Sequence, residues 1–206
     1  MMPNTSAIRP PILAGAGFAA ATLLAALLAL ILFVLHLNDR EPALLDYVAF
    51  PILFALIGIL GGGCLFRRFS VGARFGIAFA AYPLIARTLY QLGRTFPYGG
   101  VALDLITSFY FAILLPALTC GVIGAIGLSI AGGYRDFIRR GFAAFAIAGA
   151  IGGMAAPLIS WMLAQMAAES ALAATLSIYG EELLRFFLAG AGLALVLRRA
   201  SADGTQ

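Results

Sequence analysis

Long apolar runs, separated by short polar or arginine-bearing segments, dominate the pattern of this chain. The first run extends from Pro11 to Leu37 without a charged residue. About 20 apolar residues in a helix cross a ~30 Å hydrocarbon core, so this run is long enough to span a bilayer with some tilt. Similar runs predict six membrane-spanning helices, at residues 11–37, 44–66, 75–92, 103–131, 142–168 and 180–197, with residues 169–180 as a partial interfacial helix. The predicted fold class is all-α, a polytopic membrane protein in which residues 1–206 form a single domain.

Composition supports lipid as the surrounding solvent. Hydrophobic residues make up 63% of the chain and charged residues 11%, whereas soluble domains carry roughly 25% charged residues. A soluble globule with this composition would lack polar cover for its surface. Every basic residue other than the single histidine is arginine, a bias typical of a GC-rich bacterial genome. We therefore expect a bacterial cytoplasmic (inner) membrane protein.

The arginines are distributed unevenly between the predicted loops. Nine lie at the N-terminus, in the second and fourth loops and at the C-terminus, against two in the loops of the opposite side, Arg40 and Arg94. Cytoplasmic loops are enriched in arginine and lysine. Six spans with this bias place both termini in the cytoplasm, and the net charge of +4 then indicates topology rather than nucleic-acid binding.

Polar residues within the predicted helices gather toward their outer ends. Spacings of three and four residues place them on shared helix faces. They are the candidate substrate-binding residues Arg87, Gln91, Arg94, Asp104, Gln165, Glu169, Glu181, Glu182 and Arg185. The inner halves of the helices contain few polar side chains. This pattern predicts an outward-facing polar pocket, with few polar residues in the cytoplasmic half of the helices. The pocket is expected to bind or transport a small anionic solute or a lipid.

Two arginines in this set have different expected roles. Arg87 lies about 20 Å along its helix from Arg74, at 1.5 Å per residue, and no acidic residue lies within four positions of it. It is interpreted either as a buried clamp to an acid of another helix or as a ligand for an anionic group, with an interfacial position as a third alternative. Arg185 follows Glu181 by four residues, which predicts a self-paired side chain that reaches toward water.

Glycine and proline positions predict how the helices pack and bend. Two GxxxG motifs permit close helix contact and predict a homo-oligomer or partner membrane subunits; they are formed by Gly58 with Gly62 and by Gly149 with Gly153. Prolines inside the spans are candidate hinges, because each removes a backbone hydrogen bond; these are Pro83, Pro116 and Pro157. Residues 81–92 and 155–166 are identical at six of twelve positions, which is compatible either with a repeated hairpin or with chance.

Catalytic chemistry has little support in the sequence. His36 is the only histidine, and it lies at a helix end without an accompanying catalytic pattern. We predict no catalytic residue, metal site, cofactor or nucleic-acid partner, and an enzyme is not favoured. Two functions remain: binding or transport of a small solute or lipid, and a non-catalytic structural or assembly role in a larger membrane complex.

Overall fold

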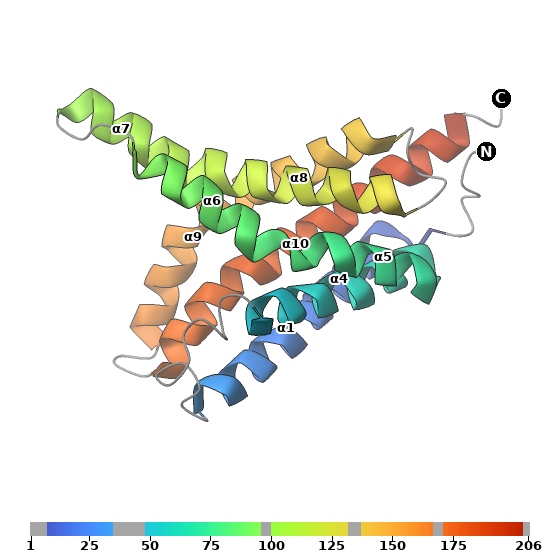
Figure 1. The fold of residues 1–206 in the computed structure, drawn as a ribbon, viewed down its shortest axis with the longest axis horizontal. Coiled ribbons are helices and arrows are strands. Elements are labelled where there is room, and N and C mark those ends of the chain that lie inside the picture. Colours follow the sequence, from blue (N-terminus) through green and yellow to red (C-terminus); the bar gives the residue numbers. More distant parts are fainter. Residues whose placement is uncertain (1–7, 35–47, 96–99, 132–136, 167–170, 204–206) are drawn as a thin grey trace.

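A computed structural model describes residues 8–34, 48–95, 100–131, 137–166 and 171–203, all but a few of which are helical. Six helical rods make up this part of the chain (Figure 1). They are α1 (Pro11–Val34), α4 (Phe50–Phe66), α5 (Phe69–Ala80) followed by α6 (Tyr82–Gly93), α7 (Val101–Phe109) followed by η3 (Tyr110–Leu114) and α8 (Leu115–Ile130), α9 (Ile138–Met166), and α10 (Ala171–Asp203). The all-α prediction is confirmed.

Four of these rods are long and apolar enough to cross a membrane: Pro11–Leu32, Phe69–Gly93, Leu103–Ile130 and Ile138–Leu158. Among the described residues, α4 is also apolar but shorter. Helix α10 has the length, but Glu181, Glu182 and Arg185 lie within its apolar stretch. The protein therefore has the helices of an integral membrane protein.

The rods pack side by side in a closed ring. Helix α1 contacts both α4 and α10, α4 forms a hairpin with α5, α5 contacts α8, α8 forms a hairpin with α9, and α9 contacts α10. Neighbouring rods therefore line a common interior. Large apolar side chains such as Leu27, Ile77 and Ile147 remain exposed on the outside, as expected of a surface that faces lipid tails.

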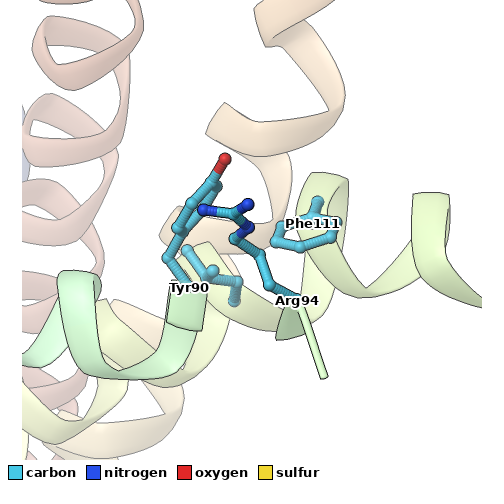
Figure 2. Close-up of a pocket in the computed structure, with 4 residues that line it drawn as sticks. Tyr90, Arg94 and Phe111 are labelled. Atoms are coloured by element: carbon cyan, nitrogen blue, oxygen red, sulfur yellow. The ribbon is translucent and has the colours of Figure 1, made fainter. Parts of the chain in front are cut away.

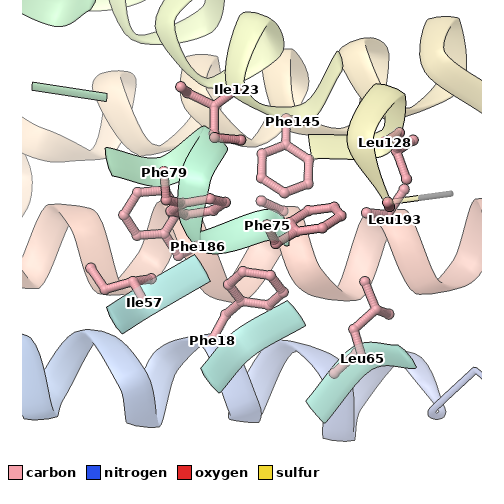
Figure 3. Close-up of a cluster of buried hydrophobic side chains, with 14 of the residues drawn as sticks. Phe18, Ile57, Leu65, Phe75, Phe79, Ile123, Leu128, Phe145, Phe186 and Leu193 are labelled. Carbon is pink, nitrogen blue, oxygen red and sulfur yellow. The ribbon is translucent and has the colours of Figure 1, made fainter. Parts of the chain in front are cut away.

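Aromatic rings fill the interior of the ring of helices (Figure 3). Phe18 of α1 stacks on Phe79 of α5 with ring centroids 5.8 Å apart, and Phe145 of α9 packs edge-on against both. Phe186 of α10 contacts Phe79 at 5.2 Å. These rings come from four rods, so they join the bundle where lipid supplies no hydrophobic driving force between helices.

The GxxxG glycines are used within the chain. A Cβ atom at Gly58 or Gly62 of α4 would lie 2.9 Å from atoms of Phe79 or Phe75 in α5, respectively. Gly149 and Gly153 of α9 face the backbone of η3 and α8 in the same way. All four glycines are buried, so the prediction that these faces bind a second chain is wrong: the two hairpins occupy them.

Two of the three candidate hinge prolines coincide with irregular backbone. Pro83 follows a break at Ala81, whose N–H donates to the Ala78 carbonyl oxygen at 3.1 Å in the tighter 3₁₀ pattern. Pro116 is the second residue of α8, two positions after the end of the π-helical turn η3, and such turns are common sites of helix bending. Pro157 lies inside α9 without interrupting it. Motion at these positions remains a prediction.

Several predicted helix boundaries are wrong because the helices extend farther than expected. The loop expected at 67–74 is confined to the residues between α4 and α5, where Arg67 adopts a left-handed conformation with φ 52°. Helix α9 begins at Ile138 rather than 142, and α10 runs unbroken from Ala171 to Asp203, so no helix boundary falls at 180. Arginine is a good helix former, and these helices continue past the apolar segment into the polar surroundings.

The arginine-bearing ends lie together. The start of α1, the end of α10, the α4–α5 connection, the end of α8 and the start of α9 lie at the right-hand end of Figure 1. The N–H of Arg9 donates to the Leu65 carbonyl oxygen at 2.9 Å, which ties the N-terminal segment to the end of α4. This arrangement gathers the described basic residues of that end into one belt: Arg9, Arg67, Arg68, Arg74, Arg139, Arg140, Arg198 and Arg199.

Candidate functional site

A pocket of about 340 Å³ lies where α6 ends beside η3 and α8 (Figure 2). It is lined by Tyr90, Arg94, Phe111 and Leu115. The rings of Tyr90 and Phe111 lie 5.3 Å apart, and the Arg94 side chain extends toward them. We call this the Arg94 pocket.

Local packing fixes the walls of the Arg94 pocket. Gly93, one residue before Arg94, packs against the rings of Tyr110 and Phe111, since a Cβ atom at that position would overlap Tyr110. The Tyr110 hydroxyl donates to the carbonyl oxygen of Leu89 at 2.6 Å. These contacts hold the end of α6 against η3, and the π-helical turn sets the direction of the Phe111 ring.

The chemistry of the Arg94 pocket suits an anion joined to an apolar group. Guanidinium is a planar donor that binds carboxylate or phosphate through paired hydrogen bonds and remains charged at all physiological pH values. Tyr90, Phe111 and Leu115 supply apolar walls beside it. The pocket is open rather than enclosed, so a ligand reaches it from the surface of the bundle.

The polar face of α6 extends from this pocket back along the helix toward its first residues. Arg87, Gln91 and Arg94 are all exposed on the chain, as is Asp104 on α7. Arg87 is therefore exposed rather than buried within this chain, and its interpretation as a clamp to an acid of another helix remains a prediction. Its interpretation as an anion ligand remains a prediction.

A second polar group lies inside the ring of helices. The Tyr82 hydroxyl donates to both carboxylate oxygens of Glu182, at 3.0 and 3.2 Å. Nη1 of Arg185 donates to Glu182 at 2.7 Å and Nη2 donates to Glu181 at 3.1 Å. We call Tyr82, Glu181, Glu182 and Arg185 the buried cluster.

The buried cluster is closely packed and largely shielded from the surface. Side-chain exposure is 11% for Arg185 and 12% for Glu182. The Tyr82 ring stacks on Phe54 with centroids 4.4 Å apart and meets Phe186 edge-on at 5.6 Å. The Arg185 alkyl chain lies against Gly152 of α9, and its Nε donates to no atom of the described residues. The predicted pairing of Arg185 with Glu181 is confirmed, but the side chain turns into the bundle rather than toward water.

The structure divides the predicted site residues into two places. Arg94 lines the open pocket, whereas Glu181, Glu182 and Arg185 gather around Tyr82, eight residues before Tyr90 and about 12 Å along α6 at 1.5 Å per residue. Gln165 and Glu169 lie outside the residues whose side chains the structure describes. Within the described residues, no group of three metal-ligating side chains comes together.

Four site residues were missed by reasoning from sequence: Tyr82, Tyr90, Phe111 and Leu115. One signal was available for Tyr82, because tyrosine in membrane helices usually lies at the interface. A tyrosine in mid-span needs a hydrogen-bond partner for its hydroxyl. Tyr90 and Phe111 resemble any lipid-facing aromatic residue in sequence, and only the approach of α6 to η3 distinguishes them.

Replacing Tyr82 by phenylalanine is expected to lower the free energy of unfolding by about 1–3 kcal/mol, since Glu182 loses a buried hydrogen-bond donor. Unfolding by a denaturing detergent in mixed micelles measures the change. Tyr90→Phe is the matched control, because Tyr90 is exposed and should lose little. Equal effects of the two substitutions would contradict a stabilising role of the Tyr82 hydroxyl.

Comparisons of the chain with protein-family models, with curated proteins and with solved structures give no match. Function must therefore be argued from the site itself.

Proposed function

We propose that this protein binds, and in a transport cycle moves, a small anionic solute or an anionic lipid headgroup at the Arg94 pocket. The proposed setting is a single domain of six transmembrane helices in a bacterial inner membrane, with both termini in the cytoplasm. The arginine belt at one end of the bundle supports this orientation, because the positive-inside rule assigns such an end to the cytoplasm. The Arg94 pocket then opens toward the outside.

The observation that carries the proposal is the placement of Arg94 beside two aromatic rings in an open pocket of about 340 Å³. The exposed Arg87 and Gln91 continue the polar face inward along α6. A ligand group released from Arg94 would meet these side chains next.

A second candidate is a structural or assembly subunit of a larger membrane complex. The exposed polar face of α6 favours it, since polar side chains at membrane depth commonly face protein or a water-filled cavity rather than lipid. On this alternative, a partner helix covers Arg87 and Gln91, and the Arg94 pocket is part of that interface.

Native mass spectrometry of the full chain, extracted in a mild detergent, tests the proposal. The wild-type protein is expected to retain a small molecule or lipid, and Arg94→Gln to lose at least nine-tenths of it, because the charge-assisted hydrogen bonds to the anion are removed. Arg74→Gln removes an exposed arginine at the opposite end of the same rod and is the matched control.

Two outcomes would contradict binding at Arg94. One is retention by Arg94→Gln of every ligand that the wild-type protein retains, in the wild-type stoichiometry, and the other is a stoichiometric second protein with no retained ligand. The second outcome supports the assembly role instead.

A further inference from the structure

An apolar groove of about 360 Å³ runs between α9 and α10 on the outside of the bundle. One wall contains Ala144, Ile147 and Ile151 of α9, and the other contains Leu188, Gly192 and Leu195 of α10. Every described residue that lines this groove is apolar. Small residues on both walls make it a channel for a thin apolar chain; a Cβ atom added at Gly192, for example, would lie 3.7 Å from the Cβ atom of Ala144.

The same two helix faces carry arginines at one end of the groove. Arg140 precedes Ala144 by four residues, and Arg199 follows Leu195 by four residues, so each lies on the face that lines the groove. Both arginines are exposed. Pro11, the first residue of α1, also lines the groove, and the exposed Arg9 lies two residues before it.

The dimensions match one leaflet of a bilayer. From Arg140 to Ile151 the distance along α9 is about 16 Å at 1.5 Å per residue, roughly half of a ~30 Å hydrocarbon core. The basic end coincides with the arginine belt, where the helices leave the hydrocarbon. An apolar channel one leaflet deep, with cations only at the headgroup level, is complementary to an anionic phospholipid. The channel matches the acyl chain, and the arginines match the negative phosphate.

We propose that the groove between α9 and α10 is a binding site for an anionic phospholipid of the leaflet at the arginine belt, with an acyl chain between the two helices and the phosphate at Arg140, Arg199 and Arg9. Basic pockets between transmembrane helices on the cytoplasmic side commonly bind such headgroups. This inference does not depend on the Arg94 pocket, which lies at the other end of the bundle.

Lipid titration of the delipidated full chain, followed by native mass spectrometry, tests the site. We expect phosphatidylglycerol to bind in preference to phosphatidylcholine with the same acyl chains. The double variant Arg140→Gln/Arg199→Gln is expected to bind phosphatidylglycerol roughly thirtyfold more weakly, because each basic side chain near an anionic headgroup contributes about fivefold. Arg67→Gln/Arg68→Gln removes the same charge from the same end at residues that do not line the groove, and should change binding less than threefold.

A second variant distinguishes lipid binding in the groove from lipid attraction by general surface charge. Gly192→Leu fills the channel while every arginine is kept, and we expect it to weaken phosphatidylglycerol binding at least tenfold. Gly192→Ala has room for its methyl group and serves as the control for folding. Unchanged binding by a folded Gly192→Leu protein overturns the proposal, and so does an equal loss in the two arginine double variants. Arg94→Gln should leave this binding intact, so failure here is distinct from failure of the proposed function.

Discussion

Replacing Arg185 by methionine is expected to destabilise the protein by about 3–5 kcal/mol, the usual cost of leaving one partner of a buried ion pair alone. Glu182 would keep only the Tyr82 hydroxyl at 3.0 Å, in surroundings where a charge has little contact with water. The unfolding free energy in mixed detergent micelles measures the loss. Arg198→Met, near the polar end of the same helix, is the matched control and should cost less than about 1 kcal/mol, as surface charges do.

Removing the pair as a whole is expected to restore most of that stability. The double variant Glu182→Leu/Arg185→Met replaces both charges by apolar side chains, a change that is often neutral or stabilising in buried sites. The coupling between the two substitutions should then be about 2–3 kcal/mol in a double-mutant cycle. Additive losses would mean that the two residues are not coupled, and that the buried cluster does not act as a unit.

This cycle also separates structure from function. If the restored double variant keeps the ligand bound at the Arg94 pocket, the buried cluster serves packing alone. If it folds normally and loses the ligand, the buried cluster takes part in the transport cycle, which starts with binding at the Arg94 pocket. A native mass spectrum of the same double variant gives the answer.

Substituting Gly72 by alanine is expected to destabilise the α4–α5 hairpin by about 2 kcal/mol, because an added methyl group overpacks a close helix contact. A Cβ atom at Gly72 would lie 2.6 Å from the Gly63 nitrogen and 2.8 Å from its Cα, with the Ile59 carbonyl oxygen also in the way. Backbone atoms cannot swing aside, so the two helices would have to separate.

The opposite sign is expected for Gly63→Ala in the same hairpin. Its nearest neighbour would be the Cα of Phe69 at 3.9 Å, an ordinary contact, while alanine stabilises a helix over glycine by about 0.5–1 kcal/mol. Unfolding of both variants in the same micelles compares them directly. Equal effects would show that the hairpin tolerates a wider helix separation than these contacts indicate.

Hydrophobic patterning determined the class of this protein. The uncharged run beginning at Pro11 and the scarcity of charge elsewhere identify membrane helices, because span length is fixed by bilayer thickness rather than by packing. The arginine belt could also be predicted from the sequence, because an arginine near a helix end favours water over hydrocarbon whatever the neighbouring helices are. The pairing of Arg185 with Glu181 followed from helical spacing within one element.

The helix ends, and the helices that pack on the GxxxG motifs, could not be predicted from the sequence. Arg74 and Arg139 were assigned to loops, yet both are helical, because helix formation continues after hydrophobicity stops. Gly58 and Gly149 fit an intermolecular contact as well as an intramolecular one, and only the hairpin geometry shows that α5 and α8 fill these faces.

The division of the polar residues into two places was decided by tertiary structure alone. Sequence spacing places residues on one face of one helix, but it does not state which way that face turns in the bundle. Helix α6 starts after the break at Ala81 and turns its first residue, Tyr82, inward to Glu182, while Arg87 in the same helix and Arg94 at its end are exposed. Rotation of α6 about its axis is set by contacts with α4, η3 and α8 and by the hydrogen bond to α10. These partners are other helices, so no local pattern encodes the rotation.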